Sequence, residues 1–128
     1  MGIPKEFRIK NSNEFSSIRS LGLRRVMPYF ITQLKVAESH EAGAESMLLT
    51  RLGVIASRRV GNAVVRNRGK RIIRRLFYKH RSLLPAGSQL VVILRFGFNT
   101  VSFAQLEDDF IESRAWYAKK FKTEGPSR

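Results

Sequence analysis

Positive charge is concentrated in one part of this chain. Between Ser46 and Leu106 there are twelve lysines and arginines and no aspartate or glutamate, and eight of the twelve lie between Arg66 and Arg81. Like charges one helical turn apart repel each other by about 0.2–0.5 kcal/mol per pair, so an exposed helix normally mixes both signs. This run therefore needs neutralisation from outside the chain, and the phosphates of a nucleic acid are the first candidate.

The same segment has the periodicity of a helix from residue 63 to about residue 83. At 100° per residue its apolar positions fall within one arc of about 140°; they are Val65, Gly69, Ile72, Ile73, Leu76 and Phe77. The opposite side carries Asn67, Arg68, Lys70, Arg71, Arg74 and Arg75. Before the helix, Gly61 is expected to form a left-handed turn and Asn62 to act as the N-cap. Backbone amides at this turn would form a small anion site.

Two less specific interpretations of the basic helix remain open. It could be an ordinary solvated face, although no acidic residue within it compensates the like-charged pairs. It could also lie on a membrane surface, but the flanking strands need its apolar face for a core. Nucleic-acid binding is favoured over both.

The rest of the chain predicts an α+β fold with the element order α-β-β-α-β-α. Strand patterns cover residues 29–37, 48–57 and 89–95, and a short helical pattern at 11–22 precedes them. A final helix begins at Ser102, which forms a capping box with Gln105. We expect a single domain over residues 1–128, with a core of about 5–120 and a frayed tail at 123–128.

Composition argues against several classes of site. There is no cysteine, which removes disulfides and cysteine-ligated zinc, and the isolated His40 and His80 make a poor metal site. The only acidic cluster, at residues 107–109, lies at a helix start, where the helix dipole explains it without a metal-dependent nuclease. No secretory signal or membrane-spanning run is found, so we expect a soluble cytoplasmic protein with no membrane partner.

The most specific motif is the gapless run from Ser57 to Arg74, which reads SRRVGNAVVRNRGKRIIR. It closely resembles the signature of the bacterial ribonuclease P protein subunit, in which Gly-Asn-Ala-Val is followed by Arg-Asn-Arg and then Lys-Arg. The Asn-Glu-Phe at residues 13–15 and the Arg-Leu-Gly at residues 51–53 agree with the same family. The resemblance covers roughly residues 5–120.

This resemblance implies a fold, a function and partners. The fold would be a small α/β sandwich with a left-handed β-α-β crossover, against the usual hand. The protein would pair with ribonuclease P RNA, one protein per RNA, and the complex would act as an endoribonuclease that removes the 5′ leader from precursor tRNA. The catalytic groups and the Mg²⁺ would belong mainly to the RNA, with no catalytic or metal-binding residue on this chain.

By position, the resemblance also implies two binding surfaces. The surface for the catalytic RNA comprises Arg66, Asn67, Arg68, Lys70, Arg71 and Arg74. The cleft for the single-stranded leader, between the sheet and the first helix, comprises Phe15, Phe30, Gln33, Ser57 and Arg58. From the residues alone, Phe15 and Phe30 fit a core equally well. Arg19 and Gln33 stand where some family members place aromatics, so leader binding is expected to rely less on stacking here.

Two functions of other classes remain as alternatives. A ribosomal or general RNA-binding protein would bind precursor tRNA complexes and mature tRNA complexes equally well. A self-sufficient ribonuclease would cleave without any RNA subunit. The long signature argues against the first alternative, and the position of the acidic residues argues against the second.

Overall fold

A four-stranded mixed sheet forms the centre of the molecule, with the strand order β1-β2-β4-β3. The computed structural model describes residues 8–9, 12–36, 50–85 and 87–123, so most of the tail expected to fray lies outside the described residues. Strand β2 (Phe30–Val36) pairs antiparallel with β1 (Leu23–Val26) and with β4 (Ser88–Leu94), whereas β3 (Arg51–Ile55) is parallel to β4. Strands β1 and β3 are therefore the two edges of the sheet.

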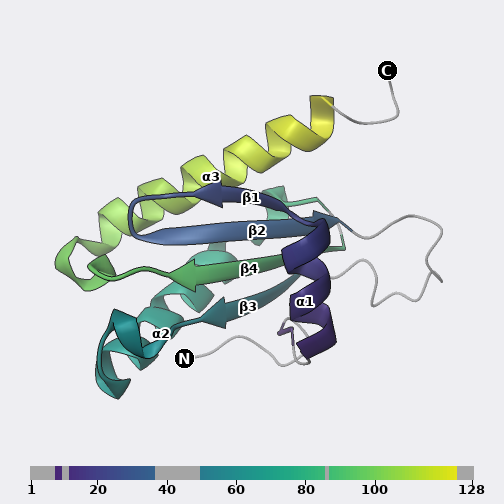
Figure 1. Ribbon diagram of the computed structural model, residues 1–128. Helices are drawn as coiled ribbons and strands as arrows, with labels where there is room; N and C mark the ends of the chain where they lie inside the picture. Colours follow the sequence, from purple (N-terminus) through teal and green to yellow (C-terminus); the bar gives the residue numbers. More distant parts are fainter. Residues whose placement is uncertain (1–7, 10–11, 37–49, 86, 124–128) are drawn as a thin grey trace.

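Helices cover both faces of this sheet. Helices α2 (Ala63–His80) and α3 (Phe103–Thr123) pack on one face, and α1 (Ser12–Leu21) packs on the other (Figure 1). In the described residues, short 3₁₀ turns connect these elements, namely η3 (Arg58–Val60), η4 (Arg81–Leu83) and η5 (Phe98–Thr100). The predicted α+β class is confirmed, and the structure adds one strand, β1, that the sequence patterns missed.

The connection from β3 through α2 to β4 has the unusual hand. In Figure 1 the parallel strands β3 and β4 both point to the left, β4 lies above β3, and α2 lies behind the sheet. A chain that follows this path makes a left-handed crossover, as the family resemblance implied. With this hand, the basic helix α2 packs on the same face of the sheet as α3, next to the edge strand β3.

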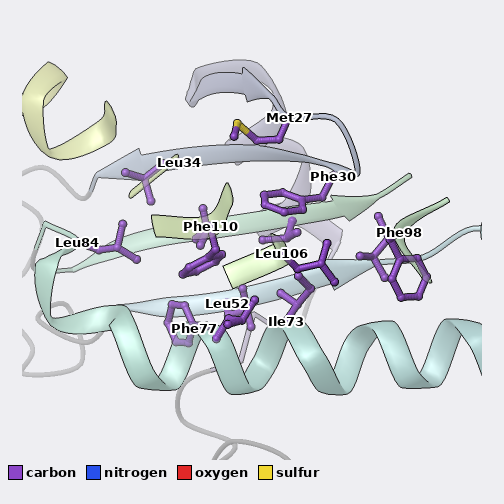
Figure 2. Close-up of a cluster of buried hydrophobic side chains, with 14 of the residues drawn as sticks. Met27, Phe30, Leu34, Leu52, Ile73, Phe77, Leu84, Phe98, Leu106 and Phe110 are labelled. Atoms are coloured by element: carbon purple, nitrogen blue, oxygen red, sulfur yellow. The ribbon is translucent and has the colours of Figure 1, made fainter. Parts of the chain in front are cut away.

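The main core lies between the sheet and the two helices α2 and α3 (Figure 2). Alternation along β4 sends Leu90, Val92 and Leu94 into this core, while Val91 faces α1 on the other side. Each large apolar side chain buried in this way contributes about 1.5–3 kcal/mol. The predicted apolar face of α2 is confirmed, since its buried residues are Gly69, Ile73, Leu76 and Phe77.

Gly69 permits the close approach of α2 to the sheet. A Cβ atom at this position would lie 2.6 Å from both Leu94 Cδ1 and Phe98 Cζ. Gly69→Ala should therefore lower the free energy of unfolding by about 1–3 kcal/mol through overpacking, despite the better helix propensity of alanine. Urea denaturation checks this, with Val64→Ala as the control, because Val64 is 76% exposed on the same helix. An unchanged unfolding midpoint in Gly69→Ala would contradict the close packing.

The carboxyl end of α2 is tied to the start of α3 by charged side chains. Glu107 Oε2 accepts hydrogen bonds from Lys79 Nζ and lies 2.8 Å from His80 Nε2, while Arg114 Nη1 donates to the His80 carbonyl. The hydrogen bonds from Lys79 and His80 lower the pKa of Glu107 below its ordinary value of 4.5. This acidic residue therefore holds two helices together, which goes beyond its expected role beside a helix dipole.

A lowered pKa in the folded state makes stability depend on pH in a defined direction. The contribution of Glu107 is fully present above its ordinary pKa of 4.5 and is lost as the pH falls through the lower folded value. The melting temperature of the protein should therefore fall more steeply below pH 4.5 than that of Glu107→Gln. Parallel pH profiles for the two proteins would show that this carboxylate does not couple the helices.

Candidate nucleic-acid interface

The start of α2 is built by two residues with separate local roles. Asn62 is the N-cap, and its side-chain oxygen accepts a hydrogen bond of 3.0 Å from the Val65 amide. Gly61 has φ 155° and ψ −170°, a positive-φ conformation that is essentially confined to glycine. The N-cap prediction is confirmed, but the turn at Gly61 is extended rather than left-handed helical.

Helix α2 presents the predicted basic residues along its outer side. Asn67, Arg68 and Arg71 are exposed, and Arg66, Lys70 and Arg74 are partly buried. Arg66 is partly committed to the fold, because its Nε donates to the Gly61 carbonyl at 3.2 Å. Arg75 lies with its guanidinium carbon 5.2 Å from the centre of the Phe103 ring. Arg68 and Arg71 therefore have the fewest internal contacts among these arginines.

No carboxylate reaches this side of α2 from the part of the chain that the structure describes. Glu14 pairs with Arg51 at 2.5 Å, and Glu112 pairs with Arg25 at 3.0 Å. Glu107 is occupied at the far end of α2, where it contacts Lys79. Within the described residues, the arginines from 66 to 75 thus form no ion pair, and an anion from outside the chain can reach them.

A small notch opens at the β3 edge of the sheet, next to α2. The backbone amide of Ile9 donates to the Leu52 carbonyl at 2.8 Å, which holds the N-terminal segment against this edge. The notch has a volume of about 110 Å³ and is lined by Arg8, Ile9, Phe15, Leu52, Gly53, Val54 and Arg74. Phe15 comes from α1 and Arg74 from α2, so the notch joins the two sides of the sheet.

The electrostatics of the notch favour an anion. Burial lowers the pKa of Arg74, and the positive charge of Arg8 lowers it further. Arg8 Nε is shielded from solvent and has no hydrogen-bond partner among the described residues. Two guanidinium groups that repel each other without a carboxylate between them are stabilised when a phosphate accepts from both. Arg8 was not among the predicted site residues.

The α1 face of the sheet carries a row of aliphatic side chains. Strand register places Val26 beside Ile31, Ile31 beside Ile93, and Ile93 beside Ile55. These residues are partly or largely exposed, and Val26 is 56% exposed. Figure 1 shows α1 over the other end of this face, where β4 begins. The row is therefore an open apolar strip beside α1, and its members are not among the site residues predicted from the sequence.

Five residues were predicted to line the leader cleft, and for Phe30 this prediction is wrong. Its side chain is 0% exposed and belongs to the core on the α2 and α3 side (Figure 2), opposite Leu94 in the sheet. Alternation along β2 puts Ile31 and Gln33 on the α1 face instead. Phe30 is therefore a structural residue, and its neighbour Ile31 is the residue that faces the α1 side of the sheet.

The other predicted cleft residues differ in their access to solvent. Phe15 lies on the α1 face and lines the notch, while Ser57 and Arg58 are exposed just after β3. Gln33 faces the same side but is only 6% exposed, so it offers little surface to a ligand. Arg19 on α1 is exposed. The structure thus brings Phe15 close to Arg74 of the basic helix.

Comparisons with known proteins agree with this architecture. The family model for ribonuclease P matches residues 3–117. The ribonuclease P protein component of Streptomyces avermitilis is 36% identical over 108 residues, which cover 84% of this chain and 88% of that protein. The one from Dictyoglomus turgidum is 36% identical over 96 residues, which cover 75% of this chain and 74% of that protein.

Two solved structures resemble the fold described above. The ribonuclease P protein of Staphylococcus aureus superimposes with a TM-score of 0.68 at 27% identity, covering 83% of this chain and 90% of that chain. The ribonuclease P protein of Thermotoga maritima gives a TM-score of 0.68 at 27% identity, covering 82% of this chain and 92% of that chain.

The left-handed crossover and the acid-free helix define a small basic α+β protein with a positively charged helical face. With the matches above, the chain belongs to the bacterial ribonuclease P protein family, the protein component of this tRNA-processing enzyme. Its partner is accordingly a ribonuclease P RNA. None of the helices in the described residues is long and apolar enough to cross a membrane.

Proposed function

We propose that α2 binds the catalytic RNA and that the α1 face of the sheet holds the 5′ leader of precursor tRNA. The observation that carries this proposal is the acid-free outer side of α2, which continues into the notch formed by Arg8 and Arg74. Each arginine that meets a phosphate releases condensed counterions and gains affinity. We infer a cytoplasmic complex with one protein per RNA.

The proposed leader surface has the composition expected for a single strand. The aliphatic row from Val26 to Ile55 offers apolar contact, and Phe15 offers a ring on which a base can stack, worth about 1–3 kcal/mol per base. Arg19 on α1 and Arg58 just after β3 are exposed as partners for phosphates. This arrangement relies on one aromatic residue and several aliphatic and basic ones, in keeping with the weaker stacking expected from the sequence.

The chemistry of cleavage is assigned to the RNA and its Mg²⁺. Mg²⁺ prefers several oxygen ligands, and within the described residues no three acidic or histidine side chains gather where they could hold a metal ion. Glu14, Glu107 and Glu112 already pair with cationic side chains. The role of this chain would be to position the leader and to reduce the repulsion between phosphates, so that the RNA binds Mg²⁺ more readily.

The leader assignment is tested by comparing two substrates in the reconstituted complex. The complex should bind precursor tRNA more tightly than mature tRNA, and Ile31→Asp should remove most of this preference by placing a carboxylate on the aliphatic row. Ala104→Asp, at an exposed position near the start of α3, adds the same charge on the opposite face of the sheet and should leave the preference intact. Equal affinity of the unaltered complex for both tRNAs would contradict the proposal and favour a general RNA-binding protein.

A further inference from the structure

A second basic and aromatic surface lies along α3 and the edge strand β1. Trp116, the only tryptophan in the chain, is partly exposed there. The Arg25 guanidinium carbon lies 5.1 Å from the centre of its ring, and Lys120 Nζ lies 5.6 Å from it. Lys119 is exposed beside them on the same helix. We call Arg25, Trp116, Lys119 and Lys120 the α3–β1 patch.

The tryptophan of the α3–β1 patch is held rigidly by the buried side chain of Tyr117. Its ring packs edge-on against Tyr117, with 5.0 Å between ring centres and 78° between the planes. Tyr117 is 1% exposed, donates to the Leu23 carbonyl at 3.0 Å and is hydrogen-bonded to Thr32 at 2.9 Å. A fixed indole loses little conformational freedom on binding, which suits it to stack against a planar ligand.

The α3–β1 patch also carries positive charge that its neighbours do not neutralise. Among the described residues, Glu112 is the one carboxylate paired with a residue of this patch, namely Arg25. Lys119 and Lys120 form no ion pair with a described carboxylate. The patch is at the opposite edge of the sheet from β3, so it is separate from the notch and from the basic side of α2.

We propose that the α3–β1 patch binds an unpaired nucleotide of RNA, with the base on Trp116 and the phosphate on Lys119 and Lys120. The base would replace the Lys120 ammonium over the ring, and the ammonium would then pair with the phosphate. A protein partner fits less well, because no large hydrophobic side chain is among the exposed ones on the described part of α3. This site lies beyond both surfaces of the proposed function.

Trp116 makes the proposal directly measurable, since all tryptophan emission of the protein comes from this position. Single-stranded oligoadenylate should quench the emission, and an RNA duplex of equal length should quench it far less. Lys120→Ala should weaken the affinity read from this quenching about tenfold, whereas Lys79→Ala, which removes the same charge from an exposed lysine elsewhere, should change it much less. Quenching should persist in Arg68→Ala, which alters only the α2 surface.

The holoenzyme then identifies which RNA supplies the nucleotide. A change in Trp116 emission on adding ribonuclease P RNA assigns the nucleotide to that RNA, and a change only on adding precursor tRNA assigns it to the substrate. Emission that responds to neither RNA would overturn the proposal, as would equal losses of affinity in Lys120→Ala and Lys79→Ala. Because emission rather than cleavage is measured, failure here is distinct from failure of the α2 and leader assignments.

Discussion

Replacing Arg68 with alanine should lower the rate of precursor tRNA cleavage by the reconstituted enzyme about tenfold at low Mg²⁺. Arg68 is exposed on α2 and forms no ion pair with the described carboxylates, so its guanidinium is free to neutralise RNA phosphates. Added Mg²⁺ supplies the same neutralisation from solution. Initial rates measured over a range of Mg²⁺ concentrations should therefore converge with those of the unaltered protein as Mg²⁺ rises.

Arg68 is a cleaner choice for this experiment than Arg66. Arg66 donates to the Gly61 carbonyl, so its removal would also disturb the turn before α2. Lys79→Ala is the matched control, because Lys79 lies on the same helix but already pairs with Glu107. A defect of equal size at every Mg²⁺ concentration would point to misfolding and would contradict the electrostatic role of Arg68.

Phe30→Ala should mainly lower the stability of the protein, whereas Phe15→Ala should mainly weaken its binding of the leader. Phe30 is fully buried, so its truncation should cost about 3–5 kcal/mol of stability. Phe15 is only partly buried, and its ring faces the notch, so its truncation should weaken leader binding about tenfold at a smaller cost in stability. Urea denaturation gives the first quantity, and titration with a leader-length single strand gives the second.

These two variants test the assignment of the sheet faces. The account requires the leader to lie on the α1 side, where Phe30 does not reach. A Phe30→Ala protein that folds with normal stability but fails to bind the leader would contradict this assignment. The leader would then lie on the α2 and α3 side of the sheet. Ile31→Val is a useful companion, because it keeps the aliphatic row while removing one methylene group.

The family resemblance implied by position that Phe30 lines the leader cleft, and alternation in a single strand could not have corrected this. Alternation along β2 separates Phe30, Thr32 and Leu34 from Ile31 and Gln33. It could not say which set faces α1, because both sets contain apolar residues. That choice depends on the register with β4, where Val91 lies beneath α1, and register is a long-range property of the chain.

Strand β1 was missed for a related reason. Its sequence, Leu23-Arg24-Arg25-Val26, is short and half charged, and only its inner side chains contact the core. Edge strands of this kind carry a weak pattern because one side of the strand meets solvent. The N-cap at Ser102, in contrast, is confirmed, because the Gln105 amide donates to Ser102 Oγ at 3.1 Å within a single turn. The Gln105 side chain donates to Asp109 at 3.1 Å, so the structure shows one of the two hydrogen bonds of the predicted capping box.

The basic helix was predictable and the notch beside it was not. Periodicity and charge identified the outer side of α2, because both are encoded within eighteen consecutive residues. Arg8 joins Arg74 only because the N-terminal segment pairs with β3, far away in sequence. Sites assembled from distant segments leave no local spacing to recognise.

The central claim is that this protein assists an RNA catalyst and does not itself cleave. The most direct test measures precursor tRNA cleavage at low Mg²⁺ with the protein alone, with a bacterial ribonuclease P RNA alone, and with both together. The account predicts efficient cleavage only when both are present, and a product with the mature 5′ end. Cleavage by the protein alone, or no enhancement of the RNA by the protein, would contradict it.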